Sequence, residues 1–276
     1  MLVNLKEILA IAKEKKFAIP AFNVYNMETV MGVIHAAEAN RAPVILQSYS
    51  RLFTNEEASY LAPMIREAAI RASVPVCFHL DHGAGYPEVA KGVRLGCTGV
   101  MIDASTHPLE ENIEITKKVT ALCNPMGIFV EGELGHIGSA ANGDEKAEYT
   151  KVDEAVRYVK ETDVSALAVM VGTAHGRYKQ APVLAIDRIR ELADATGIPL
   201  VLHGGSGVPD DQILAAVDAG IRKINFGTDV CYSFLDAVFA TDRKTVAIDL
   251  FMRGAVDSVC AFATEKIKLL GAAGKA

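Results

Sequence analysis

The chain has 276 residues, of which 50% are hydrophobic and 22% are charged. A formal net charge of −6 without a long run of like charge excludes the basic character of a non-specific nucleic-acid-binding protein. No uncharged run approaches the roughly 18 apolar residues of a membrane-spanning helix, and the amphipathic pattern of residues 1–17 is unlike a signal peptide. We therefore expect a cytoplasmic protein without a membrane partner, and its five scattered cysteines predict reduced thiols.

Short apolar runs alternate with helical patterns along the whole chain, which predicts parallel strands joined by right-handed crossovers. The expected strands are 18–23, 43–48, 75–80, 98–103, 127–133, 165–172, 198–203 and 221–226. The expected helices are 26–40, 55–73, 85–95, 109–123, 152–162, 185–196, 209–219 and 229–240, with another at 254–270. Residues 54–57, Thr-Asn-Glu-Glu, have the form of a capping box at the start of the second of these helices.

Eight such units predict one α/β domain over residues 1–276, a TIM (β/α)8 barrel with a short N-terminal helix and an extra C-terminal helix. An open doubly wound sheet is the alternative. That fold more often has fewer strands and a glycine fingerprint after the first one, which the first predicted strand lacks.

Three of the apolar runs end at a histidine, namely His82, His175 and His203. The carboxyl ends of parallel barrel strands meet at one face, so the three imidazoles can converge on one ion. Three protein ligands with a vacancy are typical of a catalytic zinc site. Asp81 lies next to this cluster, where it would stay ionised and could exchange a proton with a bound hydroxyl.

Glycine-rich turns follow the last three predicted strands, at 172–176, 203–207 and 225–229. Successive backbone N–H groups in such turns can hold an anion, and TIM barrels frequently bind phosphate after strands seven and eight. Simple tight turns are the alternative reading.

Carboxylates end the fourth and fifth predicted strands, at Asp103, Glu131 and Glu133. Asp103 or Glu133 could orient a histidine or hold a metal elsewhere, and carboxylates paired inside the barrel are the alternative. The polar segment 136–151 is a candidate lid or catalytic loop.

The motifs LDHG, GELG, GTAHG, LHGGSG and NFGTD, in this order, resemble those of the class II metal-dependent ketose-bisphosphate aldolases. The resemblance covers almost the whole chain. It implies a Zn²⁺ ion on His82, His175 and His203, with Asp81 as the acid/base residue. It also implies a monovalent cation, Na⁺ or K⁺, near the phosphate loops, a second metal at Asp103 and Glu133 in some members, and a homodimer or homotetramer. The residues implied to hold dihydroxyacetone phosphate are Gly176, Gly204, Gly205, Ser206, Asn225, Gly227 and Thr228, with Asp229 close by.

By this resemblance, zinc would polarise the ketose carbonyl and stabilise the enediolate that forms when the C3–C4 bond breaks. The substrate would be fructose or tagatose 1,6-bisphosphate, or a related ketose 1-phosphate, and the products dihydroxyacetone phosphate and an aldehyde. A zinc-dependent TIM-barrel hydrolase acting on a phosphorylated small molecule is the alternative, and a non-catalytic barrel is a third reading.

The sequence departs from the family pattern at two places. The loop glutamate that handles the proton at C3 is replaced by Ala141 in an ungapped comparison, and we assign that role to Glu145 rather than Asp144. After the second strand, Ser48 is expected to contact substrate, but Arg51 is an unexpected cation near the pocket mouth, with a surface arginine as its alternative. Arg253 matches a family arginine that grips the distal phosphate, across a subunit interface in some members.

Overall fold

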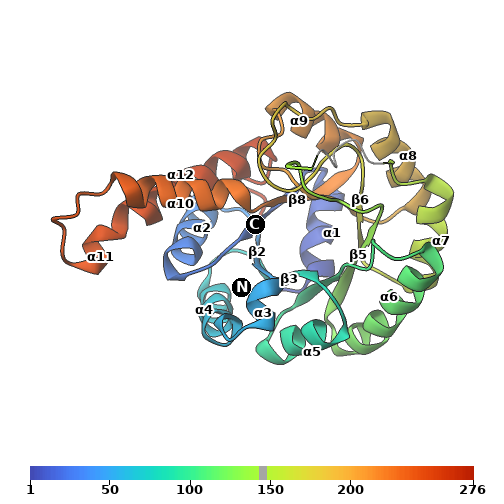
Figure 1. Ribbon diagram of the computed structural model, residues 1–276, viewed down its shortest axis with the longest axis horizontal. Helices are drawn as coiled ribbons and strands as arrows, with labels where there is room; N and C mark the ends of the chain where they lie inside the picture. Colours follow the sequence, from blue (N-terminus) through green and yellow to red (C-terminus); the bar gives the residue numbers. More distant parts are fainter. Residues whose placement is uncertain (143–147) are drawn as a thin grey trace.

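Eight parallel strands close into a barrel in the order β1 to β8 (Figure 1). This computed structural model describes residues 1–142 and 148–276. The predicted TIM barrel is thus confirmed. The strands are β1 Ile19–Asn23, β2 Val44–Tyr49, β3 Val76–Gly83, β4 Gly99–Ile102, β5 Phe129–Leu134, β6 Ala166–Val169, β7 Leu200–Leu202 and β8 Ile221–Phe226.

The helices surround the barrel, mostly where the sequence predicts them. They are α1 Leu5–Lys15, α2 Met27–Ala39, α3 Ser50–Thr54, α4 Glu57–Arg71, α5 Tyr86–Leu95, α6 Leu109–Cys123, α7 Val152–Thr162, α8 Ile186–Thr196, α9 Asp210–Ala219, α10 Thr228–Ala240, α11 Ile248–Phe251 and α12 Arg253–Leu269, with a 3₁₀ turn at Asn124–Met126. The short helix α3 was not predicted. The predicted capping box at residues 54–57 is also wrong. The Thr54 hydroxyl donates to the carbonyl of Arg51 inside α3, and the following helix α4 begins without a side-chain cap.

The amino-terminal end of the barrel is covered by α1, which contacts β1, β3, β4, β5 and β8. Leu5, Ile8 and Leu9 form its buried face. The Leu5 amide donates to the carbonyl of Thr98, directly before β4. Burial of this apolar face closes one end of the barrel, so the opposite end, where the strands finish, is the open one.

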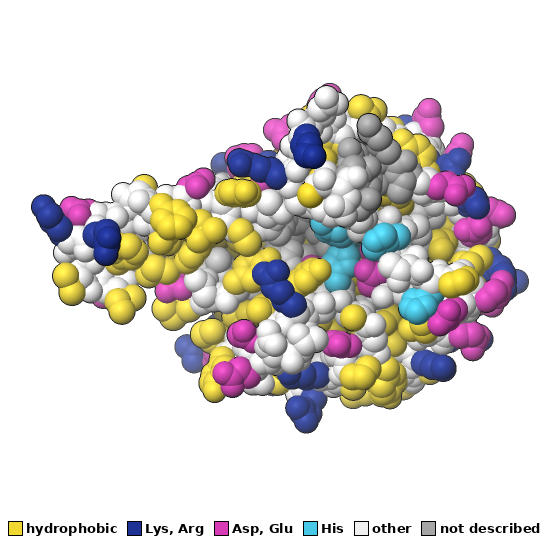
Figure 2. Space-filling view, in the orientation of Figure 1, with side chains coloured by type: hydrophobic (Ala, Val, Ile, Leu, Met, Phe, Trp, Pro, Cys, Tyr) yellow, Lys and Arg dark blue, Asp and Glu magenta, His cyan; other side chains and the backbone are white. Residues whose placement is uncertain are grey.

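Helices α10, α11 and α12 form an arm that projects away from the barrel (Figure 1). Its base is held by α12, which packs against α2. Its outer part exposes large apolar side chains, with Phe239 81%, Val246 87% and Ile248 76% accessible, and hydrophobic atoms cover much of the arm in Figure 2. No helix in the described part of the chain is long and apolar enough to cross a membrane.

Candidate active site

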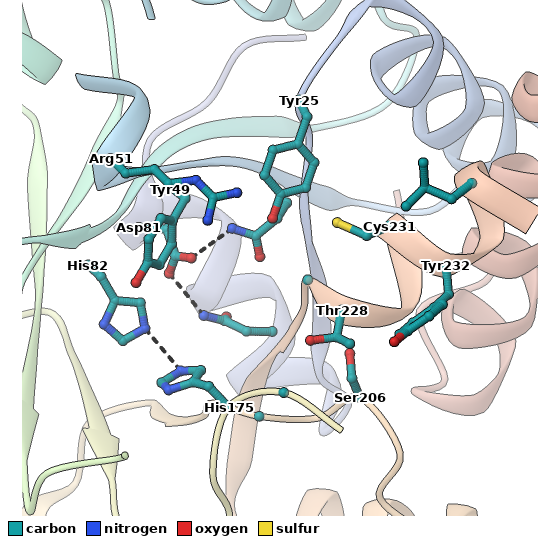
Figure 3. A pocket seen from close by; sticks show the side chains of 16 residues that line it. Tyr25, Tyr49, Arg51, Asp81, His82, His175, Ser206, Thr228, Cys231 and Tyr232 are labelled. Atoms are coloured by element: carbon teal, nitrogen blue, oxygen red, sulfur yellow. Dashed lines mark hydrogen bonds between the residues drawn. The ribbon is translucent and has the colours of Figure 1, made fainter. Parts of the chain in front are cut away.

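A cavity of about 480 Å³ opens at the carboxyl end of the barrel (Figure 3). Its wall comes from the ends of β1, β2, β3 and β8, from the turns after β6 and β7, and from the start of α10. The lining residues are Asn23, Tyr25, Tyr49, Arg51, Asp81, His82, His175, Gly176, Gly204, Ser206, Asn225, Gly227, Thr228, Cys231, Tyr232 and Leu235. Asp81 and the three predicted histidines therefore lie in or beside one hollow of the molecule, as Figure 2 shows for the histidine surface.

The structure brings His82, His175 and His203 together at this end of the barrel. The Nε2 atom of His82 lies 3.1 Å from Nε2 of His175 and 2.9 Å from Nδ1 of His203. One nitrogen from each ring lies within 4.8 Å of the other two. This spacing suits three ligands on a single ion.

The other nitrogen of each ring has a hydrogen-bond acceptor of its own. The acceptors are the Asp103 carboxylate for His82 at 2.9 Å, the Ile137 carbonyl for His175 at 3.0 Å, and the Glu131 carboxylate for His203 at 2.9 Å. An N–H on each outer nitrogen leaves the inner nitrogen with a free lone pair. Three lone pairs directed at one place repel one another unless a cation lies between them, so the residues fit a metal ion.

Burial sets the protonation of these rings. It lowers the pKa of His175 to about 4 and that of His203 well below its usual value, with the charge of His82 acting in the same direction. At His82 burial also lowers the pKa, but the charge of Asp81 and the hydrogen bond with Asp103 outweigh it and raise the pKa to about 9. Two rings are therefore held in the neutral form that binds metal, and at the third a cation would replace a proton.

Two neighbouring residues of β3 reach the cavity because the end of that strand is irregular. The pairing of β3 with β4 shifts between Leu80 and Gly83, and His82 has a φ of 51°. A regular strand would turn adjacent side chains to opposite faces. The bulge re-aims His82 while Asp81 keeps its inward direction. A left-handed backbone at a non-glycine residue is strained, and such strain concentrates at functional sites.

The Asp81 carboxylate is held from two sides and is only 3% exposed. It accepts hydrogen bonds from the side-chain amides of Asn23 at 2.7 Å and Asn225 at 3.2 Å. The two amide donors fix the direction of the carboxylate. Figure 3 shows Asp81 beside His82 in the cavity wall. A substrate hydroxyl in this cavity would meet a fixed proton acceptor.

A second group of possible ligands consists of His82, Asp103 and Glu133, whose ligand atoms also lie within 4.8 Å of one another. The Ser105 hydroxyl lies 2.7 Å from Asp103 and 3.0 Å from Glu133. Burial, together with the charge of Asp103, raises the pKa of Glu133 to about 8. Of the two carboxylates considered as orienting partners of a histidine, Asp103 is the one that contacts His82.

The glycine-rich turns form the cavity wall across from Arg51, with Gly176, Gly204, Ser206, Gly227 and Thr228 among the lining residues. Gly204 has a φ of 65°, and a Cβ atom there would lie 2.2 Å from the carbonyl oxygen of Ala174. Only glycine fits this position. The turn thus brings backbone close to the cavity, as an anion site requires.

Other predicted site residues lie outside the cavity lining. The Gly205 N–H donates a hydrogen bond to the Asn225 carbonyl. The N–H of Asp229, in the first turn of α10, donates to the Ser206 hydroxyl. Ser48 is buried on β2, where Gln47 points inward to Asn23, so the alternation of the strand turns Ser48 away. Arg253 lines a different cavity, between α2 and α12. Glu145 and Asp144 lie outside the described residues.

Several lining residues were not predicted from the sequence, namely Asn23, Tyr25, Cys231, Tyr232 and Leu235. Asn23 had a usable signal, because it is a polar residue at the end of a predicted strand. Glu131 and Lys223 lie beneath the histidines. Both are fully buried, and the Lys223 ammonium is 2.9 Å from the Glu131 carboxylate.

The chain is similar to known aldolases along its length. Residues 3–275 match the family model described as fructose-bisphosphate aldolase class-II. The chain is 38% identical over 269 residues to protein YdjI of Escherichia coli, with 96% of each covered. The crystal structure of that aldolase superposes with a TM-score of 0.91 over 100% of both chains, at 36% identity.

Relatives with other names are about equally similar. The chain is 35% identical over 283 residues to the 6-phospho-5-dehydro-2-deoxy-D-gluconate aldolase of Shouchella clausii, which covers 99% of this chain and 96% of the relative. It is also 35% identical over 285 residues to the fructose-bisphosphate aldolase of Geobacillus stearothermophilus, which covers 100% and 99%. The match extends through every strand that carries the histidine cluster and through the loops around it. The chain therefore belongs to the class II fructose-bisphosphate aldolase family and is an aldehyde-lyase.

Proposed function

We propose that this protein is a zinc-dependent aldolase that reversibly cleaves a ketose 1-phosphate to dihydroxyacetone phosphate and an aldehyde. The observation that carries the proposal is the arrangement of His82, His175 and His203, with one nitrogen of each ring facing a common point and the other engaged by an acceptor. The names of two relatives, fructose-bisphosphate aldolase and 6-phospho-5-dehydro-2-deoxy-D-gluconate aldolase, both denote lyases of phosphorylated sugar compounds.

The three histidines would hold the ion, which supplies Lewis-acid polarisation of the ketose carbonyl when bound. Asp81 takes the proton of the C4 hydroxyl as the C3–C4 bond breaks. The C4 oxygen becomes the carbonyl of the departing aldehyde, and the electron pair of the broken bond stays with the C3 fragment. A proton added at C3 completes dihydroxyacetone phosphate, a step that we assign to Glu145. Hydrogen bonds from Asn23 and Asn225 fix the direction of the Asp81 carboxylate for its step.

The phosphate of the ketose would lie against the turns after β6, β7 and β8. Gly176, Gly204, Ser206, Gly227 and Thr228 offer backbone and hydroxyl groups there, and Thr228 begins α10. The amino-terminal end of this helix favours an anion. Binding energy gained at the phosphate is remote from the C3–C4 bond and can be used to position it.

We further propose that the protein is a homodimer or homotetramer assembled through the arm. Phe239, Val246 and Ile248 expose large apolar surfaces together, which is unusual for a monomer in water. A second copy of the chain would cover this apolar surface. Arg253 begins α12 of the same arm and lines a cavity separate from the one with the histidines in its own chain, so a role for it at the substrate requires the active site of a second copy. Sedimentation velocity of the wild-type protein and of Phe239→Glu tests this. The variant should dissociate, and a monomeric wild-type protein would contradict the proposal.

The central test is an assay of triose phosphate release from a panel of ketose 1-phosphates, with metal content measured in parallel. We expect stoichiometric zinc, loss of activity with a chelator, recovery with Zn²⁺, and dihydroxyacetone phosphate as one product. Parallel assays in Na⁺ and K⁺ buffers test for a monovalent cation near the phosphate loops. Release of inorganic phosphate without carbon–carbon cleavage would instead identify a hydrolase and refute the proposal.

A further inference from the structure

We propose that Arg51 binds an anionic group on the aldehyde half of the substrate, so that the ketose carries an anion at each end. This inference rests on the proposed function, because it assigns the part of the substrate that departs as the aldehyde. It names a specificity-determining residue that the family motifs of the sequence do not contain.

Arg51 lies on α3, the short helix that follows β2, and its guanidinium is supported by two aromatic rings. Its central carbon lies 5.5 Å from the centre of the Tyr49 ring and 6.0 Å from that of Tyr25. A guanidinium over aromatic faces keeps its charge and its N–H groups free for a ligand. The two tyrosines therefore hold Arg51 at the cavity wall, as Figure 3 shows.

The same stack fixes the position of Arg51 relative to the reaction centre. The Tyr49 ring, which lies 5.5 Å from the central carbon of the Arg51 guanidinium, is also 5.7 Å from the ring of His82. Tyr49 also pairs with Asp81 in the register of β2 with β3. Arg51 and His82 thus both lie beside Tyr49, and all three residues line the same cavity.

Arg51 is the one lysine or arginine among the described residues that line the cavity. No carboxylate within the described ranges 1–142 and 148–276 forms an ion pair with it. An arginine whose fork of donors faces a cavity without an acidic partner is suited to a carboxylate or phosphate of a ligand. Arg253, the other arginine considered for this role, lines a separate cavity of its own chain.

The cavity therefore has two anion-binding sides with the reactive groups between them. The turns after β6, β7 and β8 form one side, and Arg51, after β2, lies across the closed barrel from them. Asp81 and His82 come from the end of β3, and His175 and His203 come from the turns after β6 and β7. A ketose whose phosphate lies in the turns and whose C4 hydroxyl meets Asp81 extends its remaining carbons toward Arg51.

The test uses the condensation reaction, with dihydroxyacetone phosphate and 2-hydroxyaldehydes of stepped chain length. At each length, one aldehyde ends in a neutral hydroxymethyl group, one in a phosphate and one in a carboxylate. We expect kcat/KM for the better anionic aldehyde to exceed that of its neutral counterpart about 10- to 100-fold, as for a hydrogen-bonded charged pair. The phosphate and carboxylate arms show which anion is preferred.

In Arg51→Gln, the ratio of kcat/KM for the anionic aldehyde to kcat/KM for the neutral aldehyde should fall toward one. Arg51→Lys should recover part of this preference, because lysine keeps the charge without the planar fork of donors. Added salt should raise KM for the anionic aldehyde in the wild-type protein more than in Arg51→Gln, since the guanidinium is exposed. The control is Arg94→Gln on α5, which removes one exposed charge away from the cavity. Zinc content verifies that each variant is folded.

An unchanged ratio in Arg51→Gln, or a wild-type preference for neutral aldehydes at every length, would overturn this inference and leave the aldolase assignment intact. A wild-type protein that condenses none of the aldehydes would instead overturn the proposed function.

Discussion

Removing the ammonium of Lys223 should destabilise the barrel and loosen the metal site above it. Lys223 and Glu131 are both 0% exposed, and their charged atoms are 2.9 Å apart. The other carboxylate oxygen of Glu131 lies 2.9 Å from Nε2 of His203. Nearby His79 adds no positive charge, because burial and the charge of Lys223 lower its pKa to about 3. Lys223 is therefore the cation that balances Glu131.

Lys223→Met keeps the length and apolar character of the side chain but leaves a carboxylate buried without its cation. Breaking a fully buried pair costs about 3–5 kcal/mol, against a total stability of about 5–15 kcal/mol for a typical domain. Glu131→Gln should cost a similar amount. The double variant, which leaves neither charge, should recover most of the loss, so that the coupling energy exceeds about 2 kcal/mol.

Urea denaturation of the metal-free proteins measures these free energies of unfolding, with exposed Lys268→Met as the matched control at less than about 0.5 kcal/mol. Competition with a chelator measures the metal site. Glu131→Gln should weaken zinc binding about 10- to 100-fold, because the carboxylate that orients His203 is lost. A cost below about 1 kcal/mol for Lys223→Met, or additive effects in the double variant, would show that the two charges do not act as a pair.

Three further predictions concern the site and the core. His203→Ala should lose both bound zinc and turnover, whereas Asp81→Ala should keep the metal and lose turnover at least 100-fold; metal analysis beside the lyase assay distinguishes them, and normal turnover in Asp81→Ala would refute its role. Gly204→Ala should raise KM for the ketose phosphate, since the added Cβ meets the Ala174 carbonyl at 2.2 Å; an unchanged KM would show that this turn does not hold the phosphate. Burial raises the pKa of the Cys77 thiol from 9.0 to about 12. Between these values the thiol ionises in the unfolded chain but stays neutral in the folded protein, so the folded state loses stability as the pH rises from 9 toward 12. The free energy of unfolding should therefore fall with rising pH in that window, by about 1.4 kcal/mol per unit for this thiol, and Cys77→Val should show a smaller slope in the same denaturation series.

The barrel was predictable because each strand is a short apolar run and each connection has a helical period, and these local patterns survive in the folded protein. Helix α3 was missed because five residues are too few to show a period. The meeting of His82, His175 and His203 was predictable for a related reason, since residues at the ends of parallel strands share one face. No side-chain contact needed to be known.

What the sequence did not reveal depends on contacts between distant strands. Glu131 and Lys223 are 92 positions apart in the numbering, and their pairing is visible only in the closed barrel. A lysine within the apolar strand segment IRKINF was the available signal. Ser48 shows the same dependence, because the family pattern assigns it a substrate contact, whereas in the structure it is buried outside the cavity lining and Tyr49 and Arg51 line the cavity.

The choice of substrate must depend on a few positions in the cavity wall. The chain is 35% identical both to a fructose-bisphosphate aldolase and to a 6-phospho-5-dehydro-2-deoxy-D-gluconate aldolase, so overall similarity favours neither name. Under the proposed function, the histidines and the phosphate turns serve the half of the substrate that carries the reacting carbonyl, and Asp81 acts on the C4 hydroxyl of the departing half. Among the described lining residues, we infer that Tyr25, Tyr49 and Arg51 form the side that distinguishes one aldehyde from another. If Arg51 binds the aldehyde as we propose, its positive charge makes the charge of the aldehyde a property by which this enzyme selects its substrate.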